Sequence, residues 1–121
     1  MAIGCEGDLP VAPESAEWVK FFETDSANFY YDPIDIKREG DRVRTRVLFD
    51  LKKPNKLGDH SYIGVFEFDC KEELRRLLSY VTYAEQMGGG EIVPNEVEER
   101  AWETVEPDNA QADLMHVVCS R

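Results

Sequence analysis

The residues of this chain best suited to covalent chemistry are its three cysteines, Cys5, Cys70 and Cys119. Zinc ligands and redox thiols usually lie about two to four residues apart, so these long spacings match neither kind of site. Cys70 and Cys119 each stand at the end of a predicted element, which is typical of a structural disulfide in an oxidising compartment. Two buried free thiols in a cytosolic protein would give the same pattern, and the residues alone leave both interpretations open.

Cys5 ends the stretch Ala2-Ile3-Gly4-Cys5, which is close to the residues that precede the lipid-modified cysteine of bacterial lipoproteins. Ala2 stands where a larger aliphatic side chain is usual. No charged and apolar signal region precedes the cysteine, so we expect that an export signal has been cut or replaced. Lipid attachment at Cys5 is therefore one interpretation, and a chance cysteine in a terminal segment is the other.

No spacing in the chain predicts a catalytic or metal site. His60 and His116 lack a cysteine or carboxylate at ligand spacing, and neither belongs to a nucleophile motif such as Gly-x-Ser-x-Gly. The glycines at 88–90 lack the lysine and the serine or threonine of a phosphate loop. The acidic residues between 91 and 108 lack the alternation and fixed glycine of a calcium loop, so a solvated face is the simpler interpretation. We expect no catalytic residue, no cofactor and no metal.

Arginine recurs at every second position in Arg42, Arg44 and Arg46, which predicts a basic stripe on one face of a strand. Such a stripe could bind an anion or an acidic partner. The solvent face of a strand with paired charges is the favoured interpretation. The adjacent Tyr30 and Tyr31 are a second candidate surface for a protein partner, although alternation places at least one of the two in the core.

The composition describes one acidic domain. The chain has 121 residues, a formal net charge of -11 and a hydrophobic content of 42%. This length suits a single core. No apolar run approaches the roughly 18 residues of a membrane span. The negative charge argues against general nucleic-acid binding, because attraction to phosphate needs a basic face.

The element pattern starts after a leader. Residues 1–15 are small and acidic with Pro10 and Pro13, which predicts a disordered leader or tether, and 16–121 are expected to form the single domain. Short alternating runs predict strands at 18–23 and 28–32, and Pro33 interrupts the second strand. The sequence Glu39-Gly40-Asp41 is typical of a hairpin turn.

The clearest strand is predicted over residues 42–53, and residues 61–70 return beside it. Matching the apolar faces of these two runs fixes the parity of the hairpin register. It places Glu67 and Asp69 beside Arg46 and Arg44, a favourable arrangement of charges across two strands. It also places Cys70 on the core face, where a covering helix could reach it.

Residues 71–87 are ambiguous. Leu74, Leu77, Leu78 and Val81 are spaced as in a helix, and residues 71–78 have high helix propensity. Residues 79–83, however, are rich in strand formers, and no good N-cap precedes the run. The local pattern slightly favours a helix.

The chain closes with a predicted strand at 101–105 and a helix at 109–118. Pro107 stops the preceding element, and Asp108 is the expected N-cap. A helix of about ten residues is marginal alone in water, so this one must be packed or pinned. Cys119 stands at its exit.

One set of residues between 18 and 119 comes in a distinctive order. The set consists of Trp18, Tyr30-Tyr31-Asp32, Ile36, Gly40, Phe68-Asp69-Cys70, Tyr83, the glycines after Met87, Trp102, Pro107 and Cys119. Each motif is loose, and the specificity comes from order and spacing. In these features the chain resembles the surface-adhesin protein E family, over nearly all of its predicted ordered length.

The resemblance implies an α+β fold with a single antiparallel sheet of about six strands and a C-terminal helix packed on its concave face, tied by a Cys70–Cys119 disulfide. It implies that residues 74–85 form a strand, which would start late if residues 71–78 kept their helical preference. It also implies a bacterial exported protein in the periplasm, outer membrane or cell surface, in many members with a lipid anchor.

The implied function is adhesin-like binding of a macromolecular partner, a host matrix or envelope protein, through a sheet face or edge and without catalysis. An unpaired edge also invites dimerisation by strand addition. The alternative is a small-ligand carrier or enzyme accessory protein that uses the concavity between sheet and helix, lined by Tyr83, Trp102 or His116. A cytosolic regulatory domain with free thiols is the third and weakest hypothesis.

Overall fold

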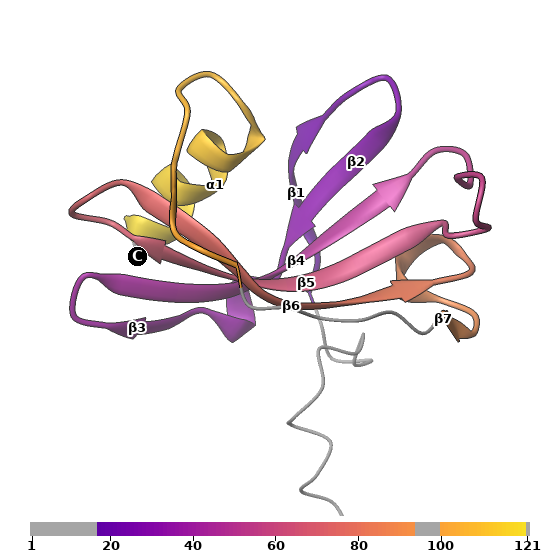
Figure 1. Ribbon diagram of the computed structural model, residues 1–121, viewed down its shortest axis with the longest axis horizontal. Helices are drawn as coiled ribbons and strands as arrows, with labels where there is room; N and C mark the ends of the chain where they lie inside the picture. The colour runs from indigo at the N-terminus through magenta and orange to yellow at the C-terminus, as the bar shows by residue number, and fades with distance from the viewer. Residues whose placement is uncertain (1–16, 94–99, 121) are drawn as a thin grey trace, which may run out of the picture.

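One curled antiparallel sheet organises the protein, and the computed structural model describes its residues 17–93 and 100–120 (Figure 1). The main path of the sheet has six strands in the order β1-β2-β4-β5-β6-β7. Their bounds are β1 Val19–Glu23, β2 Ala27–Tyr31, β4 Arg42–Leu51, β5 Ser61–Asp69, β6 Leu74–Tyr83 and β7 Ile92–Val93. Two short strands lie off this path: β3 (Lys37–Glu39) pairs with β4, and β8 (Glu103–Thr104) pairs with β6.

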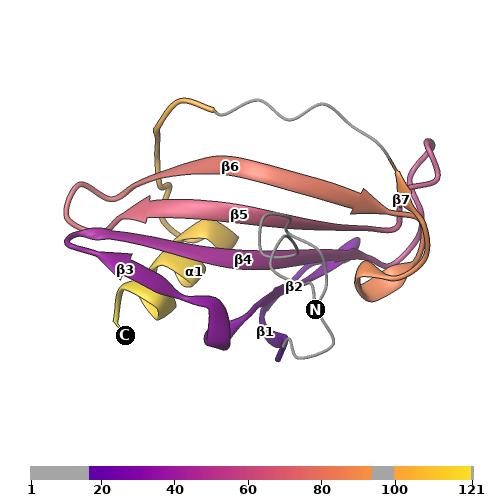
Figure 2. The same cartoon turned by 90° about the horizontal axis from the view of Figure 1, so that it is seen from below.

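The one α-helix of the described residues, α1 (Ala110–Cys119), covers one end of the concave face (Figures 1 and 2). Two short 3-10 turns complete the described elements, η2 at Pro33–Asp35 and η3 at Gln86–Gly88. No described helix has the length and apolar content needed to cross a membrane.

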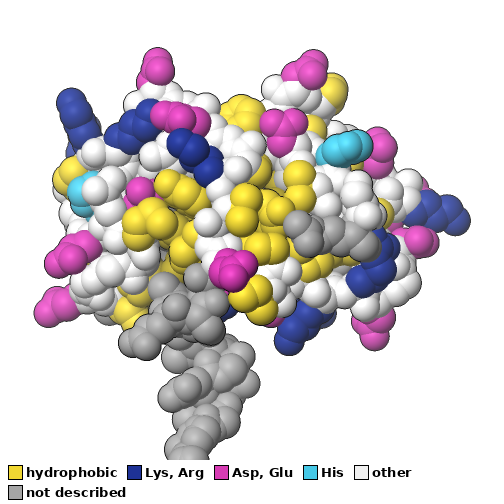
Figure 3. Space-filling view, turned by 180° about the vertical axis from the view of Figure 1, so that it is seen from behind, with side chains coloured by type: hydrophobic (Ala, Val, Ile, Leu, Met, Phe, Trp, Pro, Cys, Tyr) yellow, Lys and Arg dark blue, Asp and Glu magenta, His cyan; other side chains and the backbone are white. Residues whose placement is uncertain are grey.

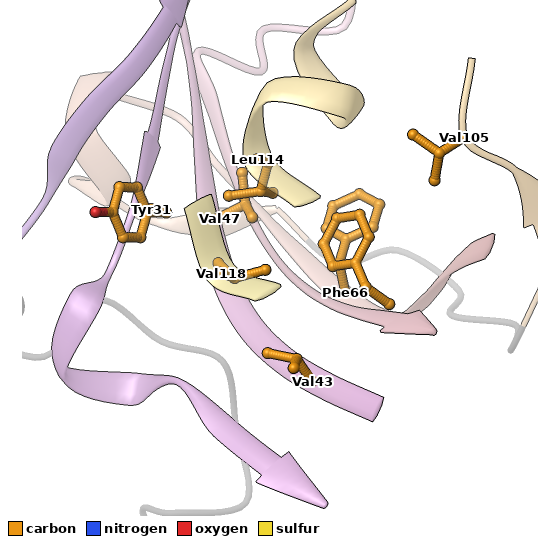
Figure 4. Packing of buried hydrophobic residues seen from close by; sticks show 8 residues of the cluster. Tyr31, Val43, Val47, Phe66, Val105, Leu114 and Val118 are labelled. Carbon is orange, nitrogen blue, oxygen red and sulfur yellow. The ribbon is translucent and has the colours of Figure 1, made fainter. Parts of the chain in front are cut away.

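Both faces of the sheet carry buried apolar side chains. The larger cluster lies between the concave face and α1, where Leu114 and Val118 of the helix pack against Val43 and Val47 of β4 (Figure 4). A smaller cluster on the outer face consists of Leu48, Ile63 and Tyr83. Alternation in β4 and β5 explains the division, since successive side chains in a strand point to opposite faces.

The predicted disulfide is confirmed. Cys70 at the end of β5 and Cys119 at the end of α1 form a bond with an S–S distance of 2.04 Å across a sequence separation of 49 residues. A hydrogen bond also connects the end of α1 to β3: the Arg38 guanidinium donates to the Cys119 carbonyl oxygen at 2.7 Å. The α+β fold with its concave-face helix is therefore confirmed as a whole.

The local preference for a helix over residues 71–87 is wrong, and so is the late start of the strand. Strand β6 begins at Leu74 and pairs with β5 along its whole length. Its register shifts by one residue between Val65 and Phe66 of β5, so a bulge accommodates the extra residue Leu78. Pairing with a long strand on one side outweighs the modest helix propensity of leucine and arginine, because tertiary context overrides a weak intrinsic preference.

The helix begins one residue later than expected. Asn109, and not Asp108, is the N-cap, and its side-chain oxygen accepts a 3.0 Å hydrogen bond from the Ala112 amide. Asp108 has a φ of 65°, which lies in the left-handed region and turns the chain into the helix instead. Asparagine and aspartate have similar capping preference, so composition alone could not choose between them.

Other expectations hold with shorter elements. The predicted turn at residues 39–41 joins β3 to β4, and Gly40 there has a φ of 63°. The strand expected at 101–105 is reduced to Glu103–Thr104. The loop expected from residue 91 is wrong at Ile92–Val93, because these residues pair with the end of β6 and form β7. The predicted leader, with Cys5, and the acidic residues 94–99 lie outside the described residues.

Candidate functional site

The arginine stripe lies on the outer face of β4, but its partners differ from those expected. Arg44 is opposite Glu67, Arg42 is opposite Asp69, and Arg46 is opposite Val65. The predicted parity is correct and the predicted register is wrong by two residues. Alternating hydrophobicity sets only the parity, whereas the length of the loop at 52–60 sets the exact pairing.

Glu67 is the centre of this face. It is only 4% exposed, and its carboxylate accepts hydrogen bonds from Arg76 at 2.9 Å and from Arg44 at 3.3 Å. Burial pushes the pKa of Glu67 upward, but the hydrogen bonds and positive charges of Arg76 and Arg44 outweigh this and hold its pKa below its ordinary value. Because both partners of this buried carboxylate belong to the same sheet, we interpret Glu67 as a structural residue and not as a binding residue.

This arrangement predicts a pH dependence. A folded-state pKa below the unfolded value stabilises the protein above the unfolded pKa of about 4.3, and this stabilisation is lost as pH falls through the folded pKa. We expect Glu67→Gln to be less stable than the natural protein at pH 7 and to lose less stability on acidification. Urea unfolding at pH 7, 5 and 3 measures the free energy of unfolding of both proteins. If this free energy falls by the same amount on acidification in the variant and in the natural protein, the prediction is contradicted.

Arg46 forms ion pairs within the fold. Its guanidinium lies 2.9 Å from Asp32 and 3.2 Å from Asp35, and its side chain is 14% exposed. The other oxygen of Asp32 accepts a 3.0 Å hydrogen bond from the Ile34 amide at the start of η2. The aspartate therefore joins the strand to the turn that follows β2, and Arg46 is a poor candidate for binding a partner.

Arg42 and Arg76 both contact the ring of Trp102. The guanidinium carbons are 5.3 Å and 4.5 Å from the centre of the indole ring, within the range of cation–π attraction. Trp102 thus lies on the outer face, not in the concavity. Of the arginine stripe, Arg42 and Arg44 keep exposed side chains, and Arg44 is 57% exposed.

The two tyrosines do not form one patch. Tyr31 is buried in the concave cluster, whereas Tyr30 is half-buried on the outer face against Leu48 and Ile63. Tyr83, expected in the concavity, is buried in the same outer cluster. Sequence reasoning identified the alternation of these residues but not the layers that cover each side.

An aromatic row crosses the concave face, and sequence reasoning missed it. Four phenylalanines from β1, β2, β4 and β5 meet edge to face with neighbouring ring centres 5.3–5.9 Å apart: Phe22, Phe29, Phe49 and Phe66. Such pairs stabilise beyond the area they bury. The parity of Phe49 and Phe66 pointed to this face, but only the strand order shows that the four rings are neighbours.

Beyond this row, away from α1, the concave face is open. A hollow of about 390 Å³ lies there, with a floor of Phe49, Tyr62, Leu77 and Tyr80. Its rim is the loop between β4 and β5, in which Leu57 is 84% exposed. We name this surface the open concave surface.

A glycine and an asparagine shape the open concave surface. A Cβ added at Gly64 would lie 3.2 Å from the Leu77 Cδ1 and 3.3 Å from the Ser79 carbonyl oxygen, so glycine permits the close packing of β5 and β6 at this point. Asn55 accepts hydrogen bonds from the amides of Leu57 and Asp59 and donates to the Tyr62 hydroxyl at 2.9 Å. The hydrogen bond from Asn55 to Tyr62 therefore holds the loop of the rim against the floor of the hollow.

Within residues 17–93 and 100–120, no group of three or more histidine, cysteine, aspartate or glutamate side chains is arranged to hold a metal ion. His60 lies in the loop before β5, and His116 lies on α1 beside β1. The open concave surface is apolar and aromatic with a few polar groups, a composition suited to binding and not to proton transfer.

Comparison with known proteins gives one family. The family description Surface-adhesin protein E matches residues 18–120. No curated protein sequence matches the chain.

Solved structures of Haemophilus influenzae protein E share the fold at 15% sequence identity. Crystal form II has a TM-score of 0.72 over 92% of both chains, and another crystal structure has a TM-score of 0.70 over 92% of this chain and 89% of the other. A structure from a non-typeable strain has a TM-score of 0.66 over 89% of this chain and 80% of the other. With the family match over nearly all described residues, the chain belongs to the surface-adhesin protein E family, a family of exported or cell-surface adhesins.

Proposed function

We propose that this protein is an exported bacterial adhesin-like protein that binds a protein partner by non-catalytic contact through its open concave surface. The family supports the adhesin role. The observation that carries the choice of surface is the exposed Leu57 above a half-buried aromatic floor. Membership of the family also supports the periplasm, outer membrane or cell surface as the location, with a lipid anchor on Cys5 as the proposed attachment; mass spectrometry of the protein from its host envelope tests that anchor.

The physical argument rests on apolar side chains that the fold leaves in contact with water. Helix α1 covers one end of the concave face and leaves the floor of the hollow beyond it only partly buried, at Phe49, Tyr62, Leu77 and Tyr80. Tyrosine and other aromatic side chains supply much of the energy of protein interfaces, because they bury a large rigid area at little cost in entropy. A partner that fills the hollow would remove these side chains from water.

The arginine side chains of the outer face are the competing surface for a protein partner. Arg42 stacks on Trp102 and Arg44 pairs with Glu67, so both already have partners within the fold. An acidic partner would therefore compete with contacts that already exist, which is why we favour the open concave surface.

Substitution of the rim and floor tests the proposal. We expect Leu57→Asp with Tyr80→Ser to reduce binding to a decellularised host matrix layer by at least about tenfold, since tyrosine is among the side chains that carry most of the energy of an interface and a buried aspartate opposes apolar contact. Arg42→Gln with Arg44→Gln is the matched control. Loss of binding in the arginine pair, with full binding in the concave pair, would move the site to the outer face.

A second candidate is the small-ligand carrier, because the hollow has the volume of a small-molecule site and converging polar groups at Asn55, Asp59 and the Tyr62 hydroxyl. Native mass spectrometry of protein purified from bacteria distinguishes the two. A stoichiometric small-molecule adduct that Tyr80→Ser removes would favour the carrier, and its absence with intact matrix binding would favour the adhesin.

A further inference from the structure

We propose that the hollow of the open concave surface binds a small organic amine, whose primary ammonium group donates a hydrogen bond to the carboxylate of Asp59. The inference deepens the carrier candidate and uses the same hollow as the proposed function, but it does not require adhesion to a matrix. The hollow has a volume of about 390 Å³, which is within the range of small-molecule sites.

Asp59 is a buried carboxylate with one unused oxygen. It lies in the loop between β4 and β5, lines the hollow and is only 7% exposed. Its Oδ2 accepts a 3.2 Å hydrogen bond from the side-chain amide of Asn55, whereas its Oδ1 is buried and has no hydrogen-bond partner among the described residues. None of the ion pairs between described residues includes Asp59. A buried carboxylate oxygen without a donor costs free energy, and a ligand that supplies the donor recovers it.

The donors of the surrounding loop are already in use. Asn55 directs one side-chain N–H to Asp59 and the other to the Tyr62 hydroxyl at 2.9 Å, and a primary amide has only these two hydrogens. The backbone amides of Leu57 and Asp59 donate to the Asn55 side-chain oxygen. The torsion about the Cβ–Cγ bond of aspartate is broad, so a rotation presents Oδ1 to the hollow, from which a ligand can donate.

The rest of the hollow suits a cation on a short apolar chain. Phe49, Tyr62 and Tyr80 provide aromatic rings, whose faces attract positive charge. Leu57 and Leu77 add apolar surface for the methylene groups of an alkyl chain. A primary ammonium group carries a positive charge and three N–H donors, so it can bond to Oδ1 and contact the rings at the same time.

The charge of the chain favours the same class of ligand. The formal net charge is -11, and acidic side chains lie at the left, the top and the right of the outline in Figure 3. A cation is attracted by the resulting field, whereas a carboxylate or phosphate ligand is repelled by it and by Asp59. A neutral alcohol can donate to Oδ1 but does not balance its charge.

A second hollow of about 390 Å³ lacks this combination. It is lined by residues of β1, β2 and α1, with Asp113 as its carboxylate and Lys20 as a positive charge of the chain itself. Asp113 is exposed, and an exposed carboxylate is hydrated and gains little from a new ion pair. Asp113 therefore provides the matched control for Asp59.

Titration of the isotope-labelled full chain with n-butylammonium at pH 7 and physiological salt, followed by nuclear magnetic resonance, tests the site. Amide shifts should concentrate at residues 55–62 and near Tyr80. Asp59→Asn keeps the oxygen that accepts from Asn55 and removes the negative charge, so it should weaken binding at least about tenfold, while Asp113→Asn leaves it unchanged. The neutral analogue n-butanol should bind the natural chain at least about tenfold more weakly than n-butylammonium.

Tyr80→Leu keeps apolar bulk and removes an aromatic face. It should weaken binding of n-butylammonium about threefold and leave n-butanol unchanged, and it carries the test if thermal unfolding shows that Asp59→Asn does not fold. Equal affinity of the natural chain for n-butylammonium and n-butanol, or equal affinity of Asp59→Asn and the natural chain for n-butylammonium, would overturn the proposal.

N-acetyl-lysine methylamide distinguishes the two sources of an ammonium group. If it binds more than about tenfold more tightly than n-butylammonium, the group belongs to a lysine of a protein partner and the assignment to a free amine is overturned. Similar affinities support the free amine. Matrix binding is measured without any amine, so the adhesin proposal stands or fails separately.

Discussion

Replacing Cys119 with serine is expected to lower the free energy of unfolding by up to about 4 kcal/mol, because the Cys70–Cys119 bond closes a loop with a sequence separation of 49 residues. The bond restricts the unfolded chain, and its loss returns that conformational freedom. Helix α1 has ten residues, too few for stability alone in water. The Asn109 cap and the packing of Leu114 and Val118 would then hold the helix without a covalent link.

Urea unfolding and thermal unfolding measure this effect in three variants, each with one cysteine replaced by serine. Cys70→Ser should match Cys119→Ser, since either change removes the same bond. Cys5→Ser is the matched control and should leave stability unchanged, because Cys5 takes no part in that disulfide. Equal melting temperatures for the natural protein and Cys119→Ser would show that the helix stays on the sheet by packing alone.

Phe68→Ala is expected to lower the free energy of unfolding by about 3–5 kcal/mol, the usual cost of removing a fully buried aromatic side chain. Phe68 lies on β5 with an exposure of 0% and belongs to the cluster beneath α1. Its removal leaves a cavity between the sheet and the helix that the disulfide prevents from closing freely. The expected loss therefore combines the transfer of apolar surface with the cost of the cavity.

Phe68→Leu separates these two contributions. Leucine restores most of the volume and should recover more than half of the lost stability, since swaps that nearly conserve volume are better tolerated. Chemical denaturation at pH 7, with the disulfide intact, provides the measurement for both variants. Alanine and leucine variants of equal stability would show that the space around Phe68 relaxes without a cavity.

The strands that alternate strongly could be predicted from sequence. Residues 42–51 and 61–69 form β4 and β5, and the core faces of both strands are those expected. Alternation is a local property, so a single strand carries the information by itself. The same reasoning predicted that Cys70 faces the helix, and the family resemblance identified its partner as Cys119.

The failures share one cause, which is that the deciding contact is distant in sequence. Residues 74–83 form a strand because β5 and β8 pair with it, although their own composition favours a helix. Arg46 contacts Asp32 and Asp35 and not Glu67, because the exact register depends on a loop and on η2. Neither the loop geometry nor the turn is encoded in the parity of the strands.

The sequence by itself determined the parity of the strands, the acidic composition, and the order of motifs that marks the family. Only the tertiary structure decided which surfaces are available for binding. In the folded protein Arg46 forms ion pairs, and Tyr30 and Tyr31 lie on opposite faces of the sheet. The aromatic row and the open concave surface are built from residues of separate strands. The physical reason is that a surface for binding is made by neighbours across the sheet, and strand order, register and the placement of one helix determine those neighbours.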